Sequence, residues 1–513
     1  MITKTLGAAV YGVNASLISI EVNIVKGTHF FMVGLPDSAV KESQHRIESV
    51  FKHLGYMMPR QRVIVNLAPA DIRKEGASYD LPIALCILRA SQQFINDDLD
   101  HYMVLGELAL DGTLRPIKGV LPIAIKALQH QCKGFILPEE NVSEAAIVEG
   151  LKVIAVKHLQ EALDFFSGKR TIVPSIVDTK EIFTRTTQDH ILDFVDVQGQ
   201  IHVKRGLEIA AAGGHNVLMI GPPGAGKTML AQRIPSILPP FTLAEALETT
   251  KVYSVLGKLV KKDGLMTARP FRAPHHTISD VALVGGGSIP QPGEISLAHN
   301  GVLFLDELPE FKRSVLEVMR QPLEDRKVHI SRAKIAVDFP SNFMLVASMN
   351  PCQCGYYNHP NKSCMCDVSA VKRYLNKVSG PLLDRIDLHI EVTPVNFDEL
   401  TNTNASATHS LTIRKRVIHA RNVQQRRFKH VTHLHTNALM PSPVVKKLCI
   451  LTTSGKKLLQ TATERLGLSA RAYHRILKVA RTIADLAESS SIQDEHLAEA
   501  IQYRSLDRAG WGS

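Results

Sequence analysis

The hydrophobic and polar positions of this chain follow three successive patterns. Short apolar strands alternate with helical stretches over residues 1–167, and the same alternation returns over residues 195–395. From residue 396 to residue 513 the apolar positions have the spacing of helices. Strands and helices that alternate in this way are typical of α/β domains. The sequence therefore predicts two α/β domains and a C-terminal helical domain, with a polar linker over residues 168–194.

The second α/β segment places polar motifs directly after apolar strands. The expected strands cover residues 216–220, 301–305 and 343–348. In open α/β sheets, ligands bind beyond the carboxyl ends of the strands. We therefore expect the functional site of this segment at that edge of its sheet.

Composition and charge narrow the class of protein. A chain of 513 residues with 45% hydrophobic residues is large enough for two or three globular cores. The net charge of +11 favours a polyanionic partner, although a generally basic protein without such a partner would look the same. The chain contains no apolar run long enough to span a membrane and no pattern of a secretory leader. We therefore expect a cytoplasmic protein.

One glycine-rich segment has the sequence of a phosphate-binding loop. It follows the apolar strand 216–220, precedes a helical stretch and reads G-x-x-x-x-G-K-T. Backbone N–H groups of such a loop surround the β-phosphate, and the helix N-terminus adds its positive end. Lys227 would contact the β- and γ-phosphates, and Thr228 would bind Mg²⁺. The segment predicts an ATP site formed by Gly221, Pro222, Pro223, Gly224, Ala225, Gly226, Lys227 and Thr228.

Two further strands end in groups that ATP hydrolysis requires. Asp306 and Glu307 follow the strand 301–305, and they would bind Mg²⁺ and act on the attacking water, respectively. Asn350 follows the third expected strand and would position that water, a role called sensor 1. By itself, Asn350 is better explained as a turn residue before Pro351. Only the order of the motifs favours the catalytic role.

Two arginines stand in segments that resemble those of a known branch of AAA+ ATPases. The segment Gly380-Pro-Leu-Leu-Asp-Arg-Ile-Asp387 resembles the arginine-finger segment of the chelatase and MCM branch, and Ser469-Ala-Arg471 resembles its sensor-2 segment. The resemblance implies that Arg385 enters the active site of a neighbouring subunit, which requires a ring. In a basic protein, solvated surface arginines are the alternative explanation.

A third segment, residues 269–279, resembles the signature of magnesium-chelatase-like AAA+ proteins. Together with Gly285-Gly-Gly287, Pro292-Gly-Glu294 and Ala298-His-Asn-Gly301, it resembles the ComM family over nearly the whole chain. Members of that family are bacterial hexameric helicases that drive branch migration during natural transformation. The resemblance implies a Lon-protease-like N-terminal α/β domain, an AAA+ P-loop α/β core and a C-terminal helical lid.

The N-terminal segment tests this resemblance, because Lon proteases use a serine nucleophile with a lysine base. Ser78 lies where Lon proteases carry the serine. Leu121 occupies the position of the catalytic lysine, and Lys118 and Lys126 are displaced from it. A serine without a base is not activated. We therefore expect a scaffold or oligomerisation domain without protease activity.

Four of the seven cysteines lie within residues 352–366. In a reducing compartment such a cluster favours a metal over disulfides, and four thiolates can bind Zn²⁺ tetrahedrally. The C-x-C spacing is less typical of zinc sites than C-x₂-C, His359 is an alternative ligand, and reduced cysteines on a loop are the simplest alternative. The expected zinc ligands are Cys352, Cys354, Cys364 and Cys366.

Basic and apolar residues alternate over residues 325–337, as in a β-hairpin with one buried face. In related ring helicases, a hairpin before sensor 1 projects into the pore, where basic residues hold phosphates without reading the sequence. A solvated charged face is the alternative. The expected DNA contacts are Arg326, Lys327, Arg332 and Lys334.

Three functions fit these motifs. The leading hypothesis is a hexameric, ATP- and Mg²⁺-dependent translocase or helicase that promotes branch migration on forked, branched or single-stranded DNA in homologous recombination. The second is an ATP-dependent protease of the Lon type, which Leu121 argues against. The third is a chelatase-type motor that remodels a partner protein without DNA. Branch migration, as opposed to DNA translocation in general, rests on the family resemblance alone.

Overall fold

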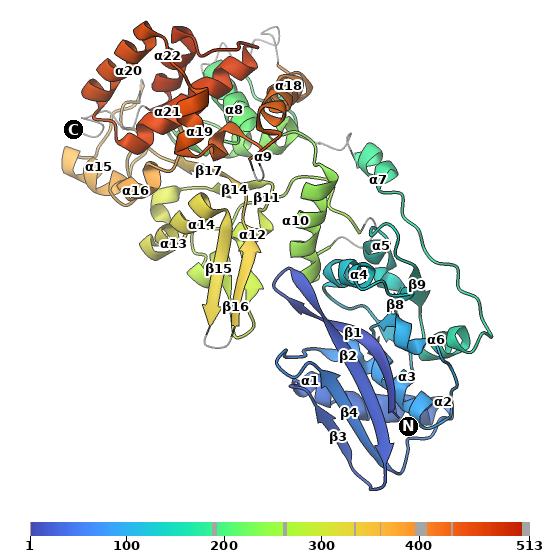
Figure 1. Ribbon diagram of the computed structural model, residues 1–513. Coiled ribbons are helices and arrows are strands. Elements are labelled where there is room, and N and C mark those ends of the chain that lie inside the picture. Colours follow the sequence, from blue (N-terminus) through green and yellow to red (C-terminus); the bar gives the residue numbers. More distant parts are fainter. Residues whose placement is uncertain are drawn as a thin grey trace. The chain divides into compact units, whose positions relative to one another are not determined.

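The chain folds into two compact units (Figure 1). The computed structural model describes residues 2–186, 192–259, 264–332, 335–359, 361–395, 408–431 and 434–504. The first unit consists of Met1–Thr186, Thr242–Thr267 and Ser331–Phe339, and the second consists of Thr187–Phe241, Ala268–Ile330 and Pro340–Ser513.

A mixed seven-stranded sheet with the order β3-β4-β2-β1-β5-β8-β9 forms the centre of the first unit. In β2 the residues Ile18, Ile20 and Val22 are fully buried and alternate with more exposed positions, so one face of this strand is covered. The strands of the unit are β1 (Ile2–Tyr11), β2 (Asn14–Val25), β3 (Phe30–Val33), β4 (Arg62–Ala68), β5 (Tyr102–Val104), β6 (Glu107–Leu108), β7 (Leu114–Arg115), β8 (Gly134–Pro138) and β9 (Val153–Val156). Its helices are α1 (Ser38–Lys41), α2 (Ser43–Leu54), α3 (Asp80–Ala90), α4 (Val120–Gln129), α5 (Val142–Ala145), α6 (Leu159–Phe166), α7 (Thr179–Thr186) and α10 (Leu243–Leu256).

Helix α10 lies in the sequence within the segment 195–395, but it belongs to the first compact unit. The helix begins at a capping box. The Thr242 hydroxyl accepts the Glu245 N–H, and the Glu245 carboxylate accepts the Thr242 N–H. Leu247 then packs against the core of the first unit. At the other end, the Gly119 N–H donates to the Ser254 carbonyl at 3.0 Å. Side-chain packing, rather than position in the sequence, assigns this helix.

A parallel five-stranded sheet with the order β11-β14-β17-β10-β18 forms the centre of the second unit. Every residue of β10, β14 and β17 is buried, as expected for a parallel sheet covered on both faces. The strands are β10 (Val217–Ile220), β11 (Phe271–Arg272), β12 (Gly285–Gly286), β13 (Gln291–Pro292), β14 (Val302–Leu305), β17 (Met344–Met349) and β18 (Leu388–Glu391). The three strands predicted from the sequence are therefore confirmed within one residue at each end.

Helices complete the second unit, and those after residue 408 form its C-terminal part. In α21 the residues Ile476, Val479, Ala480 and Ile483 form a buried stripe at helical spacing, and the Ser469 hydroxyl caps the first turn. The helices are α8 (Ile201–Gly213), α9 (Lys227–Ile237), α11 (Asp280–Val284), α12 (Glu294–Leu297), α13 (Arg313–Val318), α14 (Arg320–Asp325), α15 (Val368–Leu375), α16 (Gly380–Leu383), α18 (Ser410–Phe428), α19 (Ser442–Leu448), α20 (Thr453–Leu466), α21 (Ala470–Leu486) and α22 (Asp494–Gln502). The expected α/β fold with a helical C-terminal region is confirmed.

Two strands, β15 (Lys327–Arg332) and β16 (Ile335–Pro340), pair with each other in a separate two-stranded sheet (Figure 1). Among the described residues, no helix is both long and apolar enough to cross a membrane.

Candidate active site

The expected nucleotide motifs meet at one edge of the parallel sheet. In register, β10 pairs with β17, and β17 pairs with β14, so the carboxyl ends of these three strands are adjacent. Gly221 follows β10, Asp306 follows β14 and Asn350 follows β17. This is the edge at which α/β sheets bind ligands.

The P-loop lysine contacts the sensor-1 asparagine. Gly224 and Gly226 have φ of 77° and 85°, which favour glycine, and α9 begins at Lys227 immediately afterwards. The Lys227 ammonium donates to the Gly221 and Pro222 carbonyls at 2.7 and 2.9 Å, and to Asn350 Oδ1 at 3.1 Å. Burial lowers the pKa of Lys227, although the nearby carboxylates of the acid pair oppose that shift. These contacts bring together the two motifs that were predicted separately.

The P-loop threonine contacts the first acid of the pair. Thr228 Oγ1 donates to Asp306 Oδ2 at 2.7 Å, and the Ser348 hydroxyl donates to the other carboxylate oxygen. Mg²⁺ prefers oxygen ligands of these two types. The hydroxyl of Thr228 and the carboxylate of Asp306 therefore fit the Mg²⁺ site that the sequence predicts, and Ser348 orients the carboxylate.

The second acid of the pair, Glu307, is exposed and lies beside a histidine that had no predicted role. Glu307 has φ of 53°, and its Oε2 lies 3.7 Å from His276 Nδ1. The His275 and His276 rings lie against each other with centroids 4.0 Å apart. Both belong to the signature segment 269–279, so that segment was the available signal for this contact.

A cavity of about 380 Å³ opens beside these groups. It is lined by residues from three segments, which include Thr228, Gln232, His275, His276, Asp306 and Glu307. A cavity of this volume falls in the range of small-molecule sites. It gives a ligand access to the acid pair from the side of the two histidines.

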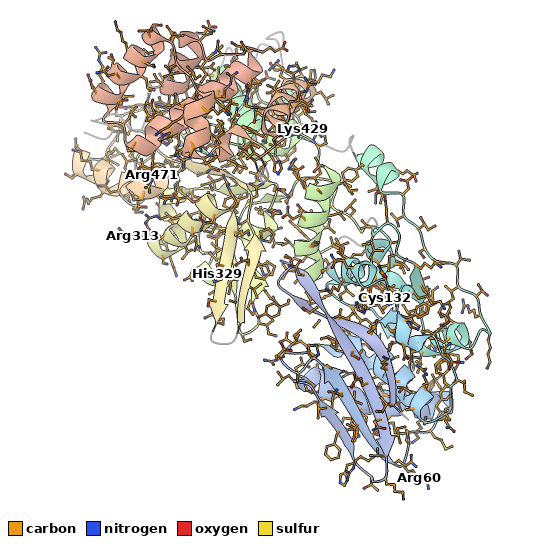
Figure 2. The ribbon with its side chains drawn as sticks, in the orientation of Figure 1. Arg60, Cys132, Arg313, His329, Lys429 and Arg471 are labelled. Carbon is orange, nitrogen blue, oxygen red and sulfur yellow. The ribbon has the colours of Figure 1, made fainter. Side chains whose placement is uncertain are left out.

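The two predicted arginines have different surroundings. Arg471 lies exposed at the start of α21 (Figure 2). Arg385 is only 5% exposed, and its guanidinium contacts Glu324 Oε1 at 2.6 Å and donates to the Pro381 carbonyl at 2.6 Å. Burial lowers the pKa of Arg385, while Glu324 raises it. The trans-acting role of Arg385 stays a prediction, and it would require the guanidinium to leave Glu324.

A buried aspartate two residues after Arg385 connects the sheet to the C-terminal helices. Asp387 accepts the Asn216 N–H at 2.9 Å and contacts the Arg475 guanidinium. His215 Nδ1 lies 3.6 Å from Asp387 Oδ2, the oxygen that accepts the Asn216 N–H. Burial opposes ionisation, but Arg475 and these neighbours hold the pKa of Asp387 far below its ordinary value. This carboxylate therefore fixes the start of β10 to α21.

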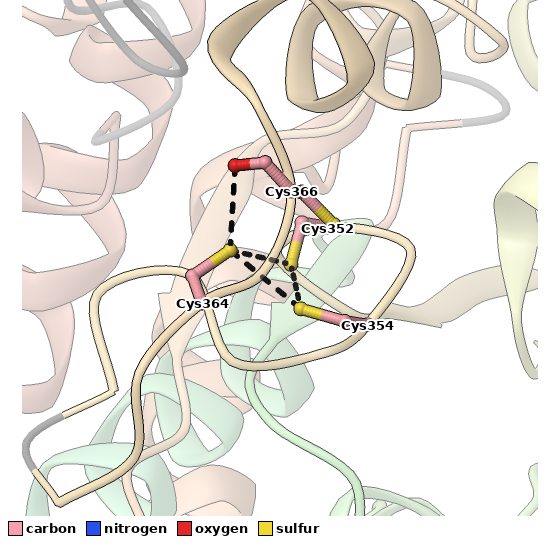
Figure 3. A group of neighbouring side chains, drawn as sticks. All are labelled: Cys352, Cys354, Cys364 and Cys366. Carbon is pink, nitrogen blue, oxygen red and sulfur yellow. Dashed lines mark hydrogen bonds between the residues drawn. The ribbon is translucent and has the colours of Figure 1, made fainter.

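The four clustered cysteines converge on one point (Figure 3). Their sulfur atoms all lie within 4.8 Å of one another, and Cys352 Sγ is 3.3 Å from Cys354 Sγ and 3.7 Å from Cys364 Sγ. Although burial works against ionisation, the backbone N–H groups of Tyr356 and Met365 lower the pKa of the Cys354 thiol to about 6. Four convergent sulfurs with N–H donors are the donor set of a tetrahedral Zn²⁺ site.

The basic hairpin agrees with its predicted alternation only in part. In β15 the residues Val328 and Ile330 are buried, whereas Lys327, His329 and Arg332 are exposed. Figure 2 labels His329 on this strand. Arg326 does not share this exposed face, because its guanidinium donates to the Phe343 carbonyl at 2.8 Å. Burial lowers the pKa of Arg326 to about 10. Lys334 lies outside the described residues.

The predicted remnant of a protease site has an aliphatic residue in place of a base. Leu121 is fully buried in the first turn of α4, where its N–H donates to Glu144 Oε1 at 2.8 Å. The Ser254 hydroxyl of α10 donates to the same oxygen. Ser78 lies in the short turn Ala77–Tyr79, and its carbonyl accepts the Gly106 N–H at 2.8 Å.

A P-loop lysine, an acid pair and a sensor asparagine at the edge of a parallel sheet define a P-loop ATPase of the AAA+ class. Comparisons with known proteins agree with this class. Residues 20–141, 193–400 and 407–504 match the families described as subunit ChlI of Mg-chelatase, magnesium chelatase subunit ChlI, and magnesium chelatase subunit ChlI C-terminal, respectively.

The chain also has relatives of nearly equal length. It is 44% identical over 503 residues to YifB of Escherichia coli, which covers 98% of this chain and 96% of YifB. It is 44% identical over 498 residues to the competence protein ComM of Haemophilus influenzae, which covers 97% of this chain and 96% of ComM. The chain therefore belongs to the ComM-like, magnesium-chelatase-like AAA+ family, and this membership implies an ATPase.

A shorter similarity concerns a protease. The chain is 30% identical over 179 residues to Lon protease 2 of Bacillus subtilis, which covers 31% of this chain and 32% of that protein. This similarity fits the Lon-like part of the predicted fold.

Proposed function

We propose that this ATPase moves DNA strands, as a hexameric ring that uses ATP and Mg²⁺ to drive branch migration. The observation that carries the proposal is the contact between Lys227 and Asn350 beside the pair Thr228 and Asp306, because a coupled motor needs phosphate, Mg²⁺ and water groups in one place. The DNA part is supported by the similarity to a competence protein and by the net charge of +11.

The hairpin β15–β16 supplies the proposed DNA contact. Lys327 and Arg332 are exposed on β15, and the chain continues from β16 into β17, which ends beside Asn350. A change at the nucleotide could therefore reach the hairpin through one strand. Contacts from such side chains to phosphates do not depend on base sequence, as translocation requires.

The same proposal assigns two metals. Thr228 and Asp306 would hold Mg²⁺ with the nucleotide phosphates, where the ion neutralises developing charge. Cys352, Cys354, Cys364 and Cys366 would hold one Zn²⁺ that closes their loop. Elemental analysis of protein washed with a weak chelator should find about one zinc ion per chain.

A chelatase-type motor that remodels a protein is the second candidate, because the matched families are chelatase subunits. A Lon-type protease is less well supported, because Leu121 is an aliphatic residue at the position of the base.

DNA binding and unwinding by the hairpin variant Lys327→Ala/Arg332→Ala tests the proposal. The wild-type protein should bind and unwind a forked or four-way DNA junction with ATP. The variant should lose unwinding, and the log–log salt dependence of its DNA binding should flatten by about two units, because two phosphate contacts are lost. ATP turnover without DNA should stay unchanged.

The variant Lys446→Ala/Lys447→Ala is the matched control, since it removes two exposed lysines from α19. It should unwind DNA like the wild-type protein. Wild-type protein that hydrolyses ATP but neither binds nor unwinds any of these DNA substrates would favour the chelatase-type motor instead.

A further inference from the structure

The loop that carries the four cysteines begins at the sensor-1 residue. Only Pro351 separates Asn350 from Cys352, and Cys352 is fully buried. The loop then turns at Gly355, whose N–H donates to the Cys352 carbonyl at 3.0 Å and whose φ is 84°. The position of this turn is therefore fixed at one end by β17 and by a buried sulfur.

The outer side of this turn lies against the P-loop. A methyl group added to the α-carbon of Gly355 would come within 2.5 Å of Pro223 Cδ and 3.0 Å of Pro223 Cγ. Farther along the loop, Tyr357, Asn358 and His359 line a small cavity whose other wall includes Gly221 and Pro222. The cysteine loop therefore lies directly against Pro223 of the P-loop and shares a cavity with the two residues before it.

A P-loop binds phosphate through backbone N–H groups that must converge before the ligand arrives. In this P-loop, glycines at 224 and 226 adopt left-handed φ values, and such residues lose more conformational freedom on ordering than others. A neighbouring surface that limits the movement of Pro223 would therefore reduce the entropy cost of nucleotide binding. The cysteine loop can supply that surface only if its own shape is fixed, and four metal–thiolate bonds would fix it.

We propose that the metal-closed cysteine loop is a brace that holds the P-loop in its phosphate-binding conformation, so that the affinity for ATP depends on bound Zn²⁺. Gly355 is the positioning residue of this brace, because it allows close approach to Pro223. The inference rests on the proposed zinc site and on the assigned nucleotide site. In this proposal, the zinc ion fixes the shape of the loop, and the loop in turn limits the movement of Pro223.

The substitution Gly355→Ala tests the brace in the full-length chain. The zinc content should stay at about one ion per chain, because no ligand is changed. The dissociation constant for a fluorescent ATP analogue should rise about tenfold, since the added methyl group must displace Pro223 or the loop. Gly55→Ala is the matched control. Its φ of 80° imposes similar backbone strain, but nothing lies within 4 Å of the added carbon, and its nucleotide affinity should stay normal.

Removal of the metal from wild-type protein provides a second measurement that does not depend on the folding of a variant. Chelator-stripped protein should bind the analogue about tenfold more weakly, and stoichiometric Zn²⁺ should restore the affinity. Normal affinity in a zinc-loaded Gly355→Ala protein would overturn the brace and leave the zinc site standing. Stripped protein with unchanged affinity would overturn the dependence on metal. Wild-type, zinc-loaded protein that binds no ATP analogue would instead overturn the nucleotide site itself.

Discussion

At the scale of single residues, Lys227 and Glu307 are both expected to act in ATP hydrolysis, the first on the phosphates and the second on the attacking water. Lys227 lies within the P-loop and contacts Asn350, whereas Glu307 is exposed beyond the acid that would hold Mg²⁺. We expect Lys227→Ala to lose both nucleotide binding and turnover. Glu307→Gln should bind ATP normally and lose turnover by about 10²- to 10⁴-fold, because a carboxylate that acts on water does not hold phosphate. Equilibrium binding and phosphate release distinguish the two defects, and normal turnover in either variant would refute the site.

Asp387 predicts a dependence of stability on pH. Its pKa in the folded protein lies far below the value of about 3.9 in unfolded chains, so its ionised form contributes stability above about pH 4. That contribution is lost progressively as the pH falls below 4. Asp387→Asn should lower the unfolding free energy at pH 7 by roughly 3 kcal/mol, because Arg475 loses its charged partner. Melting temperatures between about pH 3 and pH 7 should fall less steeply for this variant than for the wild-type protein, and parallel curves would contradict the assignment.

The sequence predicted the site residues better than their contacts. The P-loop, Asp306 and Asn350 could be predicted because each follows an apolar strand directly, and strand ends meet at one sheet edge. The contact of His276 with Glu307 and that of Glu324 with Arg385 could not be predicted, because both join segments distant in sequence through side-chain packing. The sequence also misplaced Arg326 on the exposed face of the hairpin. The alternating charge pattern does not show that its guanidinium donates to the Phe343 carbonyl, a contact made by tertiary packing.

At the scale of elements, the buried strands were predictable and helix α10 was not. The strands β10, β14 and β17 are almost entirely apolar, a pattern typical of parallel strands that are buried on both faces of a sheet. The capping box of α10 predicts a helix start, but it does not say which core the helix covers. That choice depends on Leu247 and on the bond between Ser254 and Glu144, residues far apart in the sequence.

The structure around helix α4 predicts that the protein has no protease activity. Because Leu121 is buried and its N–H is bound to Glu144, the helix presents no amine at the position of a lysine base. Purified protein with ATP and Mg²⁺ should therefore leave an unfolded substrate such as casein intact over hours. Ser78→Ala should unwind DNA at the wild-type rate. ATP-dependent cleavage that disappears in the Ser78→Ala protein would show a protease after all.

At the scale of the whole molecule, Arg385 predicts cooperation between chains. Arg385→Ala should bind ATP and hydrolyse it poorly. Mixed in equal amounts with Lys227→Ala, it should recover about a quarter of wild-type turnover, because random mixing places an intact P-loop beside an intact arginine at one site in four. The mixture of Lys227→Ala with Glu307→Gln is the control, because every active site in it lacks either the P-loop lysine or the catalytic acid. Equal turnover in both mixtures would argue against an arginine supplied by a neighbour.

The division of the chain between its two units has a practical consequence. The backbone passes from one unit to the other at residues 186/187, 241/242, 267/268, 330/331 and 339/340. A protease cut within residues 168–194 would therefore not release the N-terminal body, and a truncation that starts at residue 195 would strip α10 of the surface that buries it.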